Sequence, residues 1–218
     1  LVVATQGRSF WILDDLTLLH QLDEKELKKD ISLFRPRSVV KTRAGRGRAS
    51  LQDGQNPDGG VRVAFLLRDM PDKETVVNLS FATSGGSPVQ TYSTQPDREK
   101  KEQPLVVSKG MNEFLWNMRY PDAETFEGMV LWAGGTRGPA AIPGSYTVTL
   151  EVGSESFSSE FEILKDPRSP ATDSDFQSQL AFLLRLRDKL SATHLAIRKI
   201  RTTRKQINTL TGRLRKQM

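Results

Sequence analysis

Residues 143–163 decide the fold, and they read Pro-Gly-Ser-Tyr-Thr-Val-Thr-Leu-Glu-Val-Gly-Ser-Glu-Ser-Phe-Ser-Ser-Glu-Phe-Glu-Ile. Every second residue of the first half is apolar, namely Tyr146, Val148, Leu150 and Val152. This period of two is typical of a strand with one buried face. Gly153-Ser154 is a turn signal, and a second alternating run follows it up to Ile163. The stretch therefore predicts an antiparallel β-hairpin.

The same alternation recurs earlier in the chain, in residues 61–67, 77–81 and 112–118. Turn-forming residues separate these runs, and no helical period lies between them. Such a series of short strands indicates an antiparallel sandwich. We expect an immunoglobulin- or fibronectin-like β-sandwich over residues 31–168. Pro36 cannot donate a ladder hydrogen bond, so it predicts an edge strand or a connection.

Two apolar runs at the front, residues 1–5 and 9–13, are joined by Gln6-Gly7-Arg8 and predict a second hairpin. A hairpin of two strands is marginally stable in water, so this one needs a sheet to join. Asp14 and Asp15 are suited to capping a short helix that follows. We therefore treat residues 1–30 as a separate segment.

After Pro170 the period changes to that of a helix. No proline and a single glycine, Gly212, lie between Ala171 and Met218. Thr172 is a suitable N-cap, with aspartates in the first turn. Apolar residues recur at alternating spacings of three and four, which is a heptad seam; its main members are Leu183, Leu186, Leu190, Ile197, Ile200 and Ile207. We predict a long, basic, coiled-coil-like helix over residues 169–218.

This seam is too long to bury on one small sandwich, so it predicts pairing with another helix, in cis or in trans. A homodimer is one arrangement that would satisfy it. The net charge of +6 is concentrated here, since residues 172–218 hold eleven Lys or Arg against three Asp. Binding to a polyanion or an anionic membrane surface is the alternative use of these charges; it would involve Arg198, Lys199, Arg201, Arg204 and Lys205. Nucleic acid is the less favoured of these partners.

The sequence lacks the residue types that several classes of functional site require. The chain has no cysteine and only two histidines, His20 and His194, so we expect no disulfide, thiolate site or multi-histidine metal site. Adjacent strand residues such as Asp14 and Asp15 face opposite ways, so they do not flank one glycosidic bond. We expect no catalytic residues, cofactor or metal. The start at Leu1, without a Met or signal segment, predicts a piece of a larger protein.

Trp132 lies beside a glycine-rich loop, residues 134–144. Packing is the common role of a tryptophan, but one in such a position is also suited to stacking on a sugar ring. A carbohydrate-binding module is therefore a further alternative, with Trp132 as its contact.

Six segments resemble, in order, the C-terminal region of bacterial BNR/Asp-box (sortilin-type) glycosyl-hydrolase-like β-propeller proteins. They are Val3-Ala-Thr-Gln-Gly-Arg-Ser-Phe-Trp-Ile-Leu-Asp-Asp15, Leu33-Phe-Arg-Pro-Arg37, Asn56-Pro-Asp-Gly-Gly60, Asn112-Glu-Phe-Leu-Trp-Asn-Met-Arg-Tyr-Pro121, Gly138-Pro with Pro143-Gly-Ser-Tyr-Thr-Val148, and Lys165-Asp-Pro-Arg168. The resemblance implies that residues 1–30 are the last propeller strands, that the middle is an Ig-like domain, and that the parent protein is periplasmic or secreted. No Asp-box occurs in this sequence, so any glycosidase activity of the parent would reside outside it. The expected function is that of a non-catalytic accessory and assembly module, with the parent's propeller as its partner.

Overall fold

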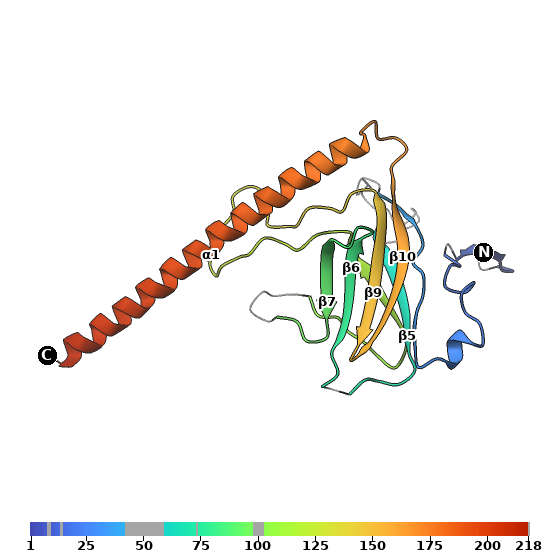
Figure 1. The fold of residues 1–218 in the computed structure, drawn as a ribbon, viewed down its shortest axis with the longest axis horizontal. Coiled ribbons are helices and arrows are strands. Elements are labelled where there is room, and N and C mark those ends of the chain that lie inside the picture. The colour runs from blue at the N-terminus through green and yellow to red at the C-terminus, as the bar shows by residue number, and fades with distance from the viewer. Residues whose placement is uncertain (8–9, 14, 42–58, 73, 98–102, 218) are drawn as a thin grey trace. The chain divides into compact units, whose positions relative to one another are not determined.

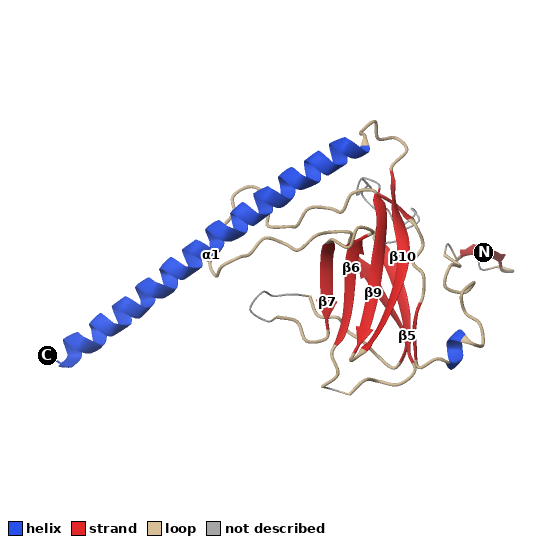
Figure 2. Cartoon of the chain, viewed as in Figure 1, coloured by secondary structure: helices blue, strands red, loops and turns tan. Residues whose placement is uncertain are grey.

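The computed structural model describes residues 1–7, 10–13, 15–41, 59–72, 74–97 and 103–217. The chain is mainly β, with several sheets and one long C-terminal helix (Figure 2), as the sequence predicts. It divides into two compact units. The first contains residues 1–118 and 143–170, and the second contains residues 119–142 and 171–218.

The first unit holds the described strands, whose order along the chain can be followed by colour in Figure 1. Two short strands form a separate hairpin, β1 (Val2–Ala4) and β2 (Phe10–Ile12). A five-stranded sheet has the order β4-β10-β9-β6-β7, and a three-stranded sheet has the order β3-β5-β8. The bounds are β3 Ile31–Leu33, β4 Val39–Lys41, β5 Val61–Leu67, β6 Val77–Thr83, β7 Pro88–Ser93, β8 Gly110–Trp116, β9 Gly144–Val152 and β10 Glu155–Lys165.

The hairpin predicted from residues 143–163 is confirmed as β9 and β10, which pair antiparallel from Val152 with Glu155 to Gly144 with Ile163. Gly153 closes the turn at φ 59°, a conformation that costs glycine little. Tyr146, Val148 and Leu150 are buried, so the alternating residues form the inner face.

The two larger sheets share one aromatic core. Trp116 of β8 is fully buried and stacks on Phe81 of β6, with ring centroids 4.3 Å apart and planes at 17°. Phe161 of β10 meets Trp116 edge-on at 6.2 Å, and Tyr146 of β9 meets it at 6.0 Å. Edge-to-face and offset pairs of this kind add to the free energy of burial. Trp116 therefore joins the inner faces of both sheets, which confirms its predicted place in the core.

Pro36 lies between two edge strands of different sheets. Before it, β3 pairs antiparallel with β5, and the Phe34 amide continues the ladder by donating to the Ala64 carbonyl at 3.0 Å. After it, β4 pairs parallel with the end of β10. The connection predicted at Pro36 is confirmed, because the chain changes sheets where it lacks an amide donor.

The N-terminal hairpin forms as predicted, but all its strand residues are exposed. The short helix that follows is placed differently from the expectation. Residues 17–21 form turns, with the Thr17 amide donating to Asp15, and the helical segment is η1, a 3₁₀ turn at Glu26–Lys28. Leu18 and Leu22 instead pack against the outer face of the three-stranded sheet, which holds this segment in place without a helix.

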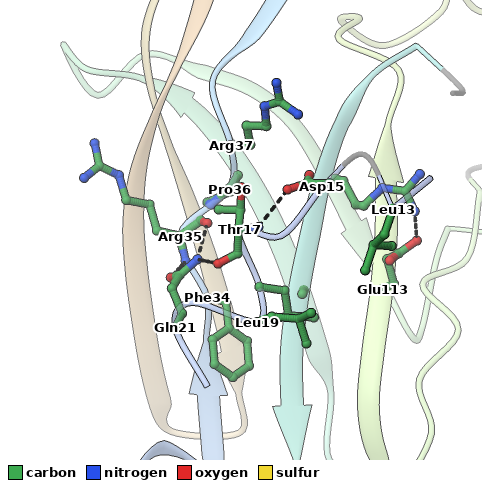
Figure 3. Close-up of a pocket in the computed structure, with 13 residues that line it drawn as sticks. Leu13, Asp15, Thr17, Leu19, Gln21, Phe34, Arg35, Pro36, Arg37 and Glu113 are labelled. Atoms are coloured by element: carbon green, nitrogen blue, oxygen red, sulfur yellow. Dashed lines mark hydrogen bonds and ion pairs between the residues drawn. The ribbon is translucent and has the colours of Figure 1, made fainter. Parts of the chain in front are cut away.

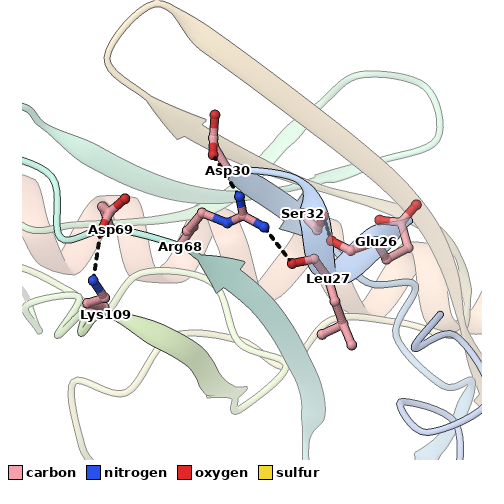
Figure 4. A network of polar contacts seen from close by, with 7 residues as sticks. All are labelled: Glu26, Leu27, Asp30, Ser32, Arg68, Asp69 and Lys109. Carbon is pink, nitrogen blue, oxygen red and sulfur yellow. Dashed lines mark hydrogen bonds and ion pairs between the residues drawn. The ribbon is translucent and has the colours of Figure 1, made fainter. Parts of the chain in front are cut away.

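Charged side chains fix the segment around η1 to the end of β5 (Figure 4). Arg68 donates to the Leu27 carbonyl at 2.9 Å and lies 3.9 Å from the Asp30 carboxylate. Nearby, Lys109 donates to Asp69 at 2.7 Å, and this bond holds the pKa of Asp69 below its usual value. All four charged groups are largely exposed, so each pair adds little to stability and mainly orients the chain.

A tight turn follows β10 at residues 166–169. The Asp166 carboxylate accepts hydrogen bonds from the Arg168 amide at 3.0 Å and from its guanidinium at 2.7 Å. These bonds favour the charged form of Asp166 and lower its pKa to about 2.

We expect an NMR titration of Asp166 to give a pKa near 2, and the Arg168→Gln variant to move that pKa towards 3.8. Because the folded pKa is depressed, the stabilisation from this turn is present above about pH 4 and disappears as the pH falls towards 2. An Asp166 pKa unchanged by the substitution would contradict the assignment.

The second unit contains α1 (Asp173–Gln217), a single helix of 45 residues. At about 1.5 Å per residue it is about 67 Å long. Its N-terminus is a capping box, as the sequence predicts for Thr172. The Asp175 amide donates to Thr172 Oγ1 at 3.3 Å, and the Thr172 amide donates to Asp175 Oδ2 at 2.8 Å.

We expect Thr172→Ala to destabilise the first turn of α1 by about 1 kcal/mol, because the Asp175 amide loses its acceptor, Thr172 Oγ1, and the Asp175 carboxylate loses the hydrogen bond from that hydroxyl. Amide exchange at Asp175 and Phe176 should then accelerate about fivefold. Ser174→Ala is the matched control, since Ser174 is exposed and adjacent. Equal exchange in the two variants would show that the cap does not hold the turn.

Candidate interaction surface on the C-terminal helix

Residues 119–142 fold back on themselves and form the rest of the second unit. We call them the return segment. Its two arms are joined by the Tyr120 amide donating to Pro139 at 2.9 Å and the Ala123 amide donating to Thr136 at 2.7 Å. The Gly138 amide donates to Asp122 Oδ1 at 2.7 Å, and Arg119 donates to the Gly138 carbonyl at the same distance. The segment is thus ordered without a regular strand.

His194 of α1 is the centre of the contact with the return segment. It is only 5% exposed. Its Nδ1 bonds to the Glu124 carbonyl at 2.5 Å, and Phe126 lies edge-on to its ring at 5.3 Å. A carbonyl oxygen only accepts, so Nδ1 carries the proton. His194 therefore holds the helix to the segment.

Other residues of α1 with the same orientation complete this contact. Ser191 Oγ accepts from the Glu124 amide at 3.1 Å, and Arg201 donates to the Glu127 carbonyl at 2.9 Å. The Arg201 guanidinium also lies 4.6 Å from the centre of the Phe126 ring, a cation–π contact. We call this the clamped face of α1; it consists of Arg187, Ser191, His194, Arg198 and Arg201.

The predicted seam divides into two rows. Leu183, Leu190 and Ile197 are half-buried. Leu186, Ile200 and Ile207 are 56%, 67% and 58% exposed, and Leu214 in line with them is 54% exposed. We call these four the exposed row, because they lie at multiples of seven residues. Consecutive helical residues are turned by about 100°, so Ile200 points away from the face of Arg201. The contacts between the clamped face and the return segment therefore leave the exposed row accessible to solvent.

The five basic residues considered for polyanion binding do not share one face. Arg198 pairs with Glu124 at 3.8 Å, and Arg201 is bound to the return segment, so both belong to the clamped face. Lys199, Arg204 and Lys205 are exposed, and no ion pair is found for them within the described part of the chain. Of the five, therefore, Arg198 and Arg201 are engaged by the return segment, and the other three extend from α1 without such a contact among the described residues.

Trp132 lies in the return segment and is 98% exposed. Its neighbours Val130 and Leu131 are 73% and 43% exposed. Packing inside this chain is therefore not the role of Trp132. The three residues form an exposed apolar stretch.

A cavity of about 250 Å³ lies in the first unit, beneath the segment that follows β2 (Figure 3). Phe34 and Ala64 of the sheet and Leu18 and Leu19 of the turns supply its apolar lining. Gln21 bridges one side, where it donates to the Arg35 carbonyl at 3.0 Å and accepts from the Arg35 amide at 2.8 Å. These bonds join the turns to the edge of the sheet, which is a structural role.

Charged residues line the rim of this cavity. Arg62 pairs with Glu113 across β5 and β8. The pKa of Asp15 is lowered, first by its hydrogen bond from Thr17 and then by the charges of Arg37 and Arg62. Asp15 is thus held as a carboxylate at neutral pH. It is suited to accepting hydrogen bonds, not to donating a proton.

Within the described residues, no group of His, Asp and Glu side chains is arranged to hold a metal ion. In the same part of the chain, no helix is both long enough and apolar enough to cross a membrane. Asp14 and residues 56–58, considered from the sequence, lie outside the described residues.

Comparison with known proteins does not extend this picture. No protein-family model matches the chain, and no curated protein shows significant similarity to it.

Proposed function

We propose that this chain is a non-catalytic accessory and assembly module of a larger propeller protein. Its long helix pairs, through the exposed row, with another helix. Such a module acts by burying apolar surface against its partner, without making or breaking a covalent bond.

One observation supports this proposal. The return segment already holds α1 through the clamped face, and the exposed row lies on a different side of the same helix. The clamped face fixes the middle of α1 to the return segment, so the helix is ordered without using Ile200, Ile207 or Leu214. Burying each of these side chains would contribute roughly 1.5–3 kcal/mol. Recurrence at seven residues is the spacing that a partner helix meets in a coiled coil.

The direct test uses a fluorescent helical peptide with Ile and Leu at its core heptad positions and Gln at the flanking ones. We expect the chain to bind it, as measured by anisotropy, and Ile207→Asp to abolish binding. Thr202→Asp is the control, because Thr202 is exposed, lies outside both named faces and receives the same charge. The absence of binding by the parent chain, or equal binding by both variants, would refute helix pairing.

The exposed N-terminal hairpin supports the propeller part of the proposal. In the N-terminal hairpin Phe10, Trp11 and Ile12 are 72%, 65% and 67% exposed, although a soluble hairpin rarely leaves such residues uncovered. A neighbouring propeller blade would cover them. We interpret the two sheets that share Trp116 as an Ig- or fibronectin-like sandwich that carries this hairpin. A periplasmic or secreted location follows from the same proposed family.

Carbohydrate binding is a second candidate, because the exposure of Trp132 leaves its ring free to stack on a sugar. The test is a glycan array probed with the chain and with Trp132→Ala. A glycan bound by the first and lost by the second would support it, and no bound glycan would exclude it.

Binding to a polyanion is the third candidate, carried by the open side chains of Lys199, Arg204 and Lys205. Binding to duplex DNA or to anionic vesicles should then weaken steeply with salt. Replacing these three residues by Gln should abolish binding. Replacement of Arg198 and Arg201 by Gln is the comparison, and it should change binding less, because the return segment already engages both side chains.

A further inference from the structure

We infer that the partner of the exposed row is an acidic amphipathic helix of a different polypeptide, and not a second copy of this chain. The inference rests on the proposed function, since it names the partner of the same surface. It is carried by the charges that border the row.

The C-terminal part of α1 has one sign of charge. From Lys189 to Met218 there are nine Lys or Arg residues and no Asp or Glu. The return segment engages two of these charges, because Arg198 pairs with the Glu124 carboxylate and Arg201 binds the Glu127 carbonyl and the face of the Phe126 ring. The remaining basic side chains therefore determine which charge a partner needs.

These remaining charges lie beside the exposed row. With Ile200, Ile207 and Leu214 as one core position of the heptad, Lys199 and Arg213 fall at one flanking position and Arg204 at the other. Leu210, which is 60% exposed, fills the second core position. Flanking positions select the partner of a coiled coil through charge. Acidic residues on the partner helix would pair with Lys199, Arg204 and Arg213.

A second copy is disfavoured by the same positions. In a parallel pair of these helices, Lys199 of one would face Arg204 of the other, and no flanking position carries an acid in either orientation. A lipid surface fits less well, because the apolar sector is narrow and contains Thr203 and Thr211. Helices that lie in the membrane interface present a wide apolar face instead.

The test compares three peptides that share one Ile/Leu core and differ only at the flanking positions, which are Glu, Gln or Lys. We expect the full chain to bind the Glu peptide at least about tenfold more tightly than the Gln peptide, and the Lys peptide most weakly. Raising NaCl from about 0.05 M to about 0.5 M should narrow these differences, since salt screens exposed charges. The double variant Lys199→Glu with Arg204→Glu should reverse the order.

The outcomes separate the inference from the proposed function. Equal, salt-independent binding of all three peptides would overturn the acidic partner and leave helix pairing standing. No binding of any peptide would overturn both. A dimer in sedimentation equilibrium that Ile207→Asp dissociates and Thr202→Asp preserves would identify a second copy and overturn the inference. Binding to anionic vesicles with no binding to the Glu peptide would do so too.

Discussion

Replacing Trp116 by alanine should lower the free energy of unfolding by about 3–5 kcal/mol, the range for a fully buried large aromatic residue. Trp116 is 0% exposed and contacts rings from three strands of the other sheet, Phe81, Tyr146 and Phe161. Its removal leaves a cavity where the inner faces of the two sheets meet. Because domains of this size have about 5–15 kcal/mol of stability, a large share of the total would be lost.

The measurement is urea unfolding followed by far-UV circular dichroism, with Trp132→Ala as the matched control. The same side chain is deleted at Trp132, but from a site that is 98% exposed. We expect the control to shift stability by less than about 0.5 kcal/mol. A loss below 1 kcal/mol at Trp116 would mean that the two sheets do not depend on one core.

The strands could be predicted because their period is local. Tyr146 to Val152 alternate, and the turn at Gly153 follows from glycine's freedom at positive φ, so both are visible in consecutive residues. The core position of Trp116 followed from the same alternation. The assignment of each strand to a sheet could not be predicted in the same way, because the pairing of β4 with β10 joins residues more than a hundred positions apart.

The candidate surface could be predicted only in part. The heptad spacing identified Ile200 and Ile207, but it did not indicate which row of the seam would be exposed. That depends on the clamp, whose helix residues are polar, as with His194 and Arg201, and so make no hydrophobic pattern. The return segment has no period of its own, so its contacts with α1 left no signal in the sequence.

Substitution of Gly138 by alanine should have the second large effect, by opening the return segment. A Cβ at this position would lie 2.0 Å from the Tyr120 carbonyl oxygen and 2.5 Å from that of Pro121. Both are backbone atoms, so neither yields by rotating a side chain. The arms must separate, and the bonds from Gly138 to Asp122 and from Arg119 to Gly138 would be strained or lost. We expect a cost of about 1–3 kcal/mol or more.

Hydrogen exchange reports this opening directly, because the Tyr120 and Ala123 amides are bonded across the two arms. Both should exchange at least about fivefold faster in Gly138→Ala, as a cost of about 1 kcal/mol or more requires. Gly135→Ala is the control, since a Cβ there meets nothing within 4 Å and its φ is not in the left-handed region. The Glu124 amide, which donates to Ser191 of α1, shows whether the clamp fails with the arms. If its exchange rises in parallel, the two arms and the helix open as one unit; unchanged exchange at Tyr120 and Ala123 would show that Gly138 does not hold the arms together.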